Sequence, residues 1–234
     1  MEHSYTWISA LSSAVPLLGN VPEYALTSLL VTILLIGIAL LVRLRSGRPE
    51  DAVVPDERVS VALLAQYFVE AMKSMAEGVI GHGAARYVPL LGSFFIFILF
   101  SNLLGLVPGF VPPTSNFNIT LGLAVVSFVA YHVYGLREHG ARYFRQFLGP
   151  VLWLVPLMLV VEVFSHAFRP VSLAIRLFAN LFADHTVLAL FTDLVPVVVP
   201  VPFYLLGAFV SVIQAFVFTM LSAVYIALAV SHEH

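Results

Sequence analysis

The sequence predicts an all-α integral membrane protein with about five transmembrane helices, two of them long and tilted, and one amphipathic interfacial helix. Composition is the first reason: the 234 residues are 60% hydrophobic and 10% charged, whereas a soluble domain carries about 25% charged residues. The second is that apolar runs recur at the length of a span, about 20 helical residues. We therefore expect one membrane domain covering residues 1–234.

Span 1 is expected at residues 24–44. No Lys or Arg precedes this run, and it is longer than the apolar part of a signal peptide, so we expect it to be retained. Arg43, Arg45 and Arg48 close it, and positive charges favour the cytoplasmic side. This orientation places the N-terminus outside and, after five spans, the C-terminus in the cytoplasm.

Residues 61–82 have the pattern of an amphipathic helix. Apolar side chains recur at steps of three and four, at Val61, Leu64, Phe68, Met72, Met75 and Val79. Polar side chains fill the other face, at Gln66, Glu70, Lys73, Ser74 and Glu77. A helix lying in the cytoplasmic interface is the first interpretation, and a helix facing a soluble domain is the alternative.

Spans 2 and 3 are expected at residues 87–107 and 119–136. The uncharged loop between them is rich in Pro and Gly and turns the chain on the outer side. Arg137, Arg142 and Arg145 follow span 3, so the positive-inside pattern is consistent along the chain.

Two longer apolar segments follow, at residues 151–191 and 201–230, separated by Asp193 and the prolines 196, 200 and 202. Both exceed the length that a perpendicular helix needs. We therefore expect both helices to tilt or kink, with Pro156 and Pro170 as the candidate kink points.

Arg176 is the most informative residue, because a charge at membrane depth costs about 2.5 to 3.5 kcal/mol on insertion scales and is functional by default. Polar residues share its helical face, since steps of three and four keep one side of a helix. This polar seam comprises Glu162, His166, Arg169, Arg176, Asn180 and Asp184, with Leu173 as its one gap. A path for ions or protons and a set of structural ion pairs are the two interpretations.

Two further residues could serve such a path. His185 lies nine residues after Arg176 and points to the opposite side of the helix. Beside Asp184, it could exchange protons near neutral pH, although a histidine in a core is often simply hydrogen-bonded. Gln214 has no ionisable proton and could orient a guanidinium or bond a neighbouring backbone.

Other function classes lack their signatures. The sequence has no cysteine, no Gly-rich phosphate loop with Lys, no HExxH motif and no defensible Ser and His arrangement. A net charge of -2 argues against nucleic acid as a partner. We expect no cofactor, no metal and no enzymatic activity of the chain on its own.

The run RPVSLAIRLFANLFADH at 169–185, followed by IQAFVF at 213–218 and Tyr225, closely resembles subunit a of F-type ATP synthases. The segments NLLGLVP at 102–108 and NFNITL at 116–121 extend the likeness over nearly the whole chain behind the first span. The resemblance implies a stator subunit whose two long tilted helices curve around a rotating ring of c subunits.

The resemblance also implies residue roles. Arg176 would face the ring carboxylate between two offset half-channels, with Glu162, His166 and Ser172 lining the cytoplasmic one. Asn180, Asp184 and His185 would line the outer one, Gln214 would neighbour the arginine, and Asn102, Asn116 and Asn118 would lie near the outer entry. Implied partners are the c-subunit ring, b-type peripheral stalk subunits, the lipid bilayer and translocated H⁺, with Na⁺ second, in a bacterial inner membrane.

The chain departs from the family pattern at two places. Many bacterial members have Gly-Glu where this chain has Asp184 and His185, and have a histidine where this chain has Gly207. Chloroplast-type members, with Asp-Glu and Gly, are nearest in motif. Our hypothesis is that Asp184 supplies the carboxylate that His185 needs.

Two other classes compete with a stator subunit. A self-contained proton-coupled secondary transporter would be expected to have paired repeats and a site at the midplane, and we find no convincing repeat. A structural membrane anchor would not need the polar seam.

Overall fold

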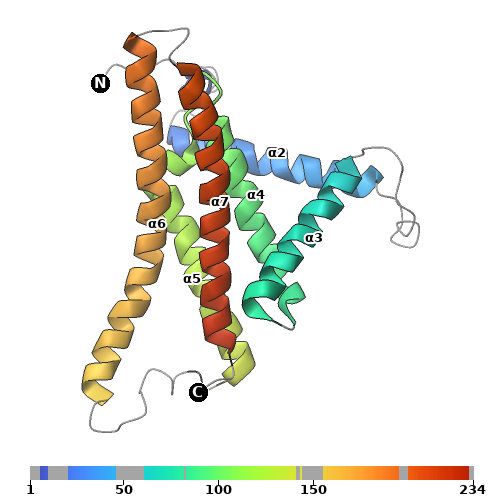
Figure 1. Cartoon of the computed structure of the whole chain (residues 1–234), viewed down its shortest axis with the longest axis vertical. Coiled ribbons are helices and arrows are strands. Elements are labelled where there is room, and N and C mark those ends of the chain that lie inside the picture. Colours follow the sequence, from blue (N-terminus) through green and yellow to red (C-terminus); the bar gives the residue numbers. More distant parts are fainter. Residues whose placement is uncertain are drawn as a thin grey trace. The chain divides into compact units, whose positions relative to one another are not determined.

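The computed structural model describes residues 6–9, 21–45, 61–81, 83–140, 143, 155–194 and 200–231. Its regular elements in these ranges are all helical, and five helices are long and apolar enough to cross a membrane. The predicted all-α membrane class is thereby confirmed. The chain divides into two compact units, Met1–Pro113 and Thr114–His234 (Figure 1), and each is described by itself.

The first unit contains α2 (Glu23–Arg45), α3 (Val61–Ile80), the short 3-10 helix η2 (Ala84–Tyr87) and α4 (Val88–Leu104). Pro89 occupies the first turn of α4, where a proline removes no helical hydrogen bond. Both α2 and α3 contact α4, and Figure 1 shows α2 lying steeply across it. The buried side chains of Leu91 and Ile98 make α4 the core of this unit.

The N-terminal segment is tied to the loop after α4. The backbone N–H of Trp7 donates to the carbonyl of Gly109 over 3.1 Å, and its indole N–H donates to the carbonyl of Pro108 over 3.2 Å. The Thr6 hydroxyl donates to the Glu23 carboxylate at the start of α2. These bonds join the start of α2 to the loop that follows α4.

Helix α3 uses only part of its predicted apolar stripe for packing. The Phe68 ring lies 5.7 Å from the Phe95 ring of α4, and Met72 is buried. A Cβ at Gly92 would lie 3.5 Å from the Phe68 ring, an ordinary van der Waals contact. Leu64, in the first part of α3, is exposed, and the position of α3 at a membrane interface remains a prediction.

The second unit contains the short 3-10 helix η3 (Pro113–Ser115), whose first residue precedes the unit, and α5 (Phe117–His139), α6 (Val155–Leu194) and α7 (Pro200–Val230). Asn116 caps α5, because its side chain accepts the backbone N–H of Asn118 over 2.9 Å. Each long helix contacts the other two, and α6 and α7 run antiparallel (Figure 1). Leu177, Phe218 and Ile226 are among the fully buried side chains between them.

Helix α6 continues through Pro170 over 40 residues, which corresponds to about 60 Å at 1.5 Å per residue. Figure 1 shows it changing direction in its N-terminal half. Pro156 is the second residue of the described helix, and Pro170 lies in its interior. A kink at Pro156 and the tilt of α6 in a membrane remain predictions.

Some expectations lie outside the described residues. They are the start of the long helix at 151–154, the last position of the amphipathic helix at 82, the arginines at 48, 142 and 145, and the proline at 196.

Candidate functional site

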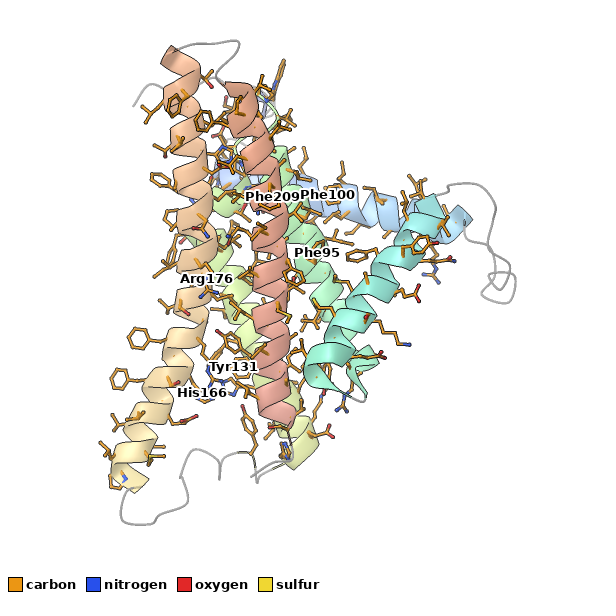
Figure 2. All side chains as sticks on the ribbon, viewed as in Figure 1. Phe95, Phe100, Tyr131, His166, Arg176 and Phe209 are labelled. Atoms are coloured by element: carbon orange, nitrogen blue, oxygen red, sulfur yellow. The ribbon has the colours of Figure 1, made fainter. Side chains whose placement is uncertain are left out.

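Arg176 lies near the middle of α6 (Figure 2) and is exposed on this helix. Exposed apolar side chains of the same helix include Phe168, 63% exposed, and Ile175, 48% exposed, while the polar Ser172 and Asn180, one turn away on either side, are exposed as well. Within the described ranges, Arg176 makes no ion pair and no hydrogen bond to Gln214 or Asn180. The helix thus presents a permanent cation on a mainly apolar surface.

The opposite surface of α6 is buried against its own unit. Its side chains include Leu173, Leu177, Leu181 and Leu188, together with His166. The polar seam lies at the boundary between the two surfaces, so His166 turns inward whereas Arg176 and Asn180 turn outward. Tertiary packing therefore divides a set of residues that helical spacing alone had placed together.

His166 is the centre of a buried polar cluster nearer the N-terminal end of α6 (Figure 2). Its Nδ1 lies 3.0 Å from the backbone carbonyl oxygen of Glu162 and 3.3 Å from Glu162 Oε1. His166 is 7% exposed, whereas the Glu162 side chain is 34% exposed. The pair therefore connects a solvent-accessible carboxylate with an interior imidazole.

Two residues of α5 adjoin His166. The centroid of its ring lies 5.6 Å from that of His132 and 6.2 Å from that of Tyr131. The Tyr143 hydroxyl oxygen lies 2.7 Å from His132 Nδ1. We call Tyr131, His132, Tyr143, Glu162 and His166 the His166 cluster.

Arg169 lies among aromatic rings beside this cluster. Its Cζ is 5.5 Å from the centroid of the Tyr225 ring of α7, a cation–π distance. Its guanidinium interacts with Tyr131, although the Tyr131 hydroxyl does not meet the geometry of a hydrogen bond. Arg169 thus connects α6 to both neighbouring helices.

The remaining predicted residues lie apart from the His166 cluster. The Ser172 hydroxyl is exposed and donates to the carbonyl of Arg169 over 3.1 Å. Asp184 and His185 are half-buried and interact with each other, and His185 Nε2 is buried without a hydrogen-bond partner in the described part of the chain. Gln214 is buried on α7.

The three asparagines have different surroundings. Asn116 is the cap of α5, with Asn118 exposed in the first turn. Asn102 is fully buried near the end of α4, in the first unit. Within the described ranges, no group of three or more carboxylates and histidines converges to hold a metal.

Sequence analysis, which relied on helical spacing within one segment, did not identify Tyr131, His132 and Tyr143 as candidate site residues. For His132 a signal was available, because it is an ionisable residue within a predicted apolar span. Tyr143 had none, since it follows α5 among residues of mixed polarity. Only the packing of α5 against α6 shows that these side chains meet.

Comparison with known proteins identifies a family and relatives that are similar in sequence to this chain. The family described as ATP synthase A chain matches residues 25–227. ATP synthase subunit a of Bdellovibrio bacteriovorus is 42% identical over 232 residues, 99% of this chain and 100% of the relative. That of Trichlorobacter lovleyi is 37% identical over 234 residues, all of both chains. ATP synthase subunit a 1 of Syntrophotalea carbinolica is 43% identical over 205 residues, 88% of this chain and 84% of the relative.

The family model matches most of the residues, and two of the relatives align over nearly the full length of both chains. The structure has five helices long and apolar enough to cross a membrane, and Arg176 lies on one of them. The chain is a multi-pass membrane protein that belongs to the ATP synthase A chain family.

Proposed function

We propose that this chain is the proton-translocating stator subunit of a rotary F-type ATP synthase. In this proposal it provides two offset half-channels to the carboxylate of a c-subunit ring, separated by Arg176. The observation that carries the proposal is the exposed guanidinium of Arg176 on a mainly apolar helix surface, without an anion from the described part of its own chain. Such a charge in a bilayer needs a partner, which a second chain would supply.

The chemistry of arginine suits this role. Its pKa lies above about 12, so it stays charged where a lysine could lose its proton. A permanent cation blocks the direct passage of protons and favours the ionised form of a nearby carboxylate. A proton arriving from one side would then leave on the other only after the ring has turned. Each proton crossing 100 mV supplies about 2.3 kcal/mol for that rotation.

The cytoplasmic half-channel is assigned to Glu162, His166 and Ser172. The contact between a partly exposed Glu162 and a buried His166 supports this assignment, since it joins solvent to the interior. The outer half-channel is assigned to residues whose arrangement as a path remains a prediction: Asn180, Asp184, His185, Gln214, Asn102, Asn116 and Asn118.

The implied assembly follows from the names of the relatives and the polar seam. The chain would contact a c-subunit ring, b-type peripheral stalk subunits and lipid, and would carry H⁺ rather than Na⁺. It would have no catalytic activity of its own and would lie in a bacterial inner membrane with its N-terminus outside. A self-contained secondary transporter is the second candidate, because a buried polar cluster could also serve a substrate.

The test is ATP-driven proton pumping in inverted vesicles that contain the whole complex with Arg176→Ala. We expect pumping to be lost while the complex still assembles. The matched control is Arg137→Ala, an exposed arginine at the end of α5, which should pump normally. Pumping at the wild-type rate in the Arg176 variant would reject the proposal and favour the transporter.

A further inference from the structure

The side of the His166 cluster formed by α5 has no role in the proposed half-channels. His132 is held by the hydroxyl of Tyr143, 2.7 Å from Nδ1. Tyr143 is itself buried, with 3% of its surface exposed. Its ring lies over Gly135, where a Cβ would collide with the ring and would lie 3.0 Å from the Ala229 carbonyl oxygen of α7. The position of the hydroxyl is therefore fixed by packing.

The His132 imidazole is close to the side chain assigned to the cytoplasmic half-channel. Its ring centroid is 5.6 Å from that of His166, with the two planes inclined by 32°. At this separation a positive charge on one ring disfavours a proton on the other.

Other groups facing His132 also affect its protonation. Arg169 on α6 repels a positive charge on His132, and Glu162 provides a negative charge beside His166. Within the described residues, Tyr131 on α5 and Tyr225 on α7 are further titratable groups near the pair. With one fixed cation and one carboxylate nearby, the pair can hold one proton more readily than two.

We propose that His132 is a further proton-holding residue of the cytoplasmic half-channel, held by Tyr143 and coupled to His166. The inference rests on the proposed function and adds an α5 residue to a path otherwise assigned to α6 on this side. A proton taken up by a ring nitrogen of the pair forms an N–H bond there. The same proton leaves when that bond breaks, so each ring returns to its neutral form after every transfer.

The experiment measures passive proton conductance through the membrane sector as a function of pH. The vesicles contain the whole complex, whose soluble part is then stripped. The variants are His132→Asn, His166→Asn and the double variant, since asparagine keeps a polar side chain but exchanges no proton near neutrality. His139→Asn is the matched control, because it replaces the other histidine of α5 outside the His166 cluster.

We expect His132→Asn to lower the proton conductance near neutral pH by about threefold or more and to change its pH profile. The double variant should resemble His166→Asn, because the two residues act together. Tyr143→Phe, which removes one oxygen, should change the pH profile in the same direction, so the test remains if His132→Asn does not assemble. A packing role alone would lower assembly but leave the pH profile of the assembled complexes unchanged.

The inference is overturned if both His132→Asn and Tyr143→Phe keep the wild-type pH profile, or if the effects of His132→Asn and His166→Asn are independent. Arg176→Ala in vesicles that keep the soluble part, assayed for ATP-driven pumping beside the His132 variants, separates the two proposals. If that variant abolishes coupled pumping while the His132 variants behave as wild type, only this inference fails. If it pumps normally, the proposed function itself fails.

Discussion

Arg169 and Arg176 are seven residues apart on one helix, yet their surroundings differ. Arg169 is half-buried and lies over the Tyr225 ring, with Tyr131 nearby. Arg176 is exposed on a mainly apolar helix surface, with the polar Ser172 and Asn180 one turn away. The guanidinium of Arg169 therefore has an aromatic partner inside the unit, whereas that of Arg176 faces outward from it. We expect the first to contribute to stability and the second to function.

The first prediction compares Arg169→Gln with Arg176→Gln. Loss of the cation–π contact with Tyr225 should reduce stability by about 0.5 to 2 kcal/mol in the Arg169 variant. The Arg176 variant should keep wild-type stability and lose proton pumping. SDS-titrated unfolding in mixed micelles measures the first effect, and pumping in inverted vesicles measures the second. Equal loss of stability in both variants would contradict the distinction.

The second prediction concerns the close approach at Gly135. A Cβ at this position would meet the Tyr143 ring and the Ala229 carbonyl oxygen, so Gly135→Ala should destabilise the chain by about 1 to 3 kcal/mol through overpacking. Gly122→Ala on the same helix is the control, because nothing lies within 4 Å of its Cβ. The control should be neutral or slightly stabilising, since alanine favours helix. The same mixed-micelle unfolding measures both, and a Gly135→Ala as stable as Gly122→Ala would show that Tyr143 is loosely held.

At the scale of the elements, α5 joins the second unit, because it contacts both α6 and α7. Its contact with α7 includes a buried hydrogen bond, in which the Ser127 hydroxyl donates to the Ser222 hydroxyl over 2.8 Å. Most other hydroxyls of these helices bond their own backbone, as Ser211 does to the carbonyl of Gly207. The bond between Ser127 and Ser222 is therefore a specific link between two helices.

The third prediction is a double-mutant cycle on this bond. Ser127→Ala and Ser222→Ala should be coupled by about 0.6 kcal/mol, and by no more than about 1.7, which is the range for polar contacts between membrane helices. Ser127→Ala combined with Ser211→Ala should be additive, because Ser211 bonds within its own helix. Unfolding in mixed micelles gives the four free energies, and a coupling of zero would mean that the bond contributes nothing net.

At the scale of the whole molecule, large apolar side chains remain exposed in both units. Ile33 and Leu41 of α2 are examples in the first, and Leu205 and Phe209 of α7 in the second. Surfaces of this kind are covered by lipid or by other chains. The five candidate spans and the arginine positions also predict an orientation, with the N-terminus outside.

The fourth prediction tests that orientation and uses the absence of native cysteine. A single cysteine at Val21, before α2, should react with a membrane-impermeant maleimide in intact spheroplasts. A single cysteine at Glu138, at the end of α5, should react only in inverted vesicles. The two substitutions serve as each other's control, and the reverse pattern would invert the predicted topology.

Helical periodicity predicted the polar seam but not its division. Steps of three and four put Glu162 and His166 on one face of a helix, and the structure has the two side chains 3.3 Å apart. The same steps could not tell which edge of the seam faces inward, since that depends on where α5 and α7 pack. His132 and Tyr143 were missed for the same reason. The assignment of the half-channel residues remains a prediction.

The sequence by itself determined the all-α membrane class and the existence of the long helices, because length and apolarity are properties of local segments. It also identified Arg176 as a charge within an apolar segment, whose role remains a prediction. Tertiary structure alone decided that Arg169 lies against Tyr225, that His166 is buried and that His132 joins it. These contacts link helices far apart in the chain, and only the packing of side chains between helices selects which faces meet.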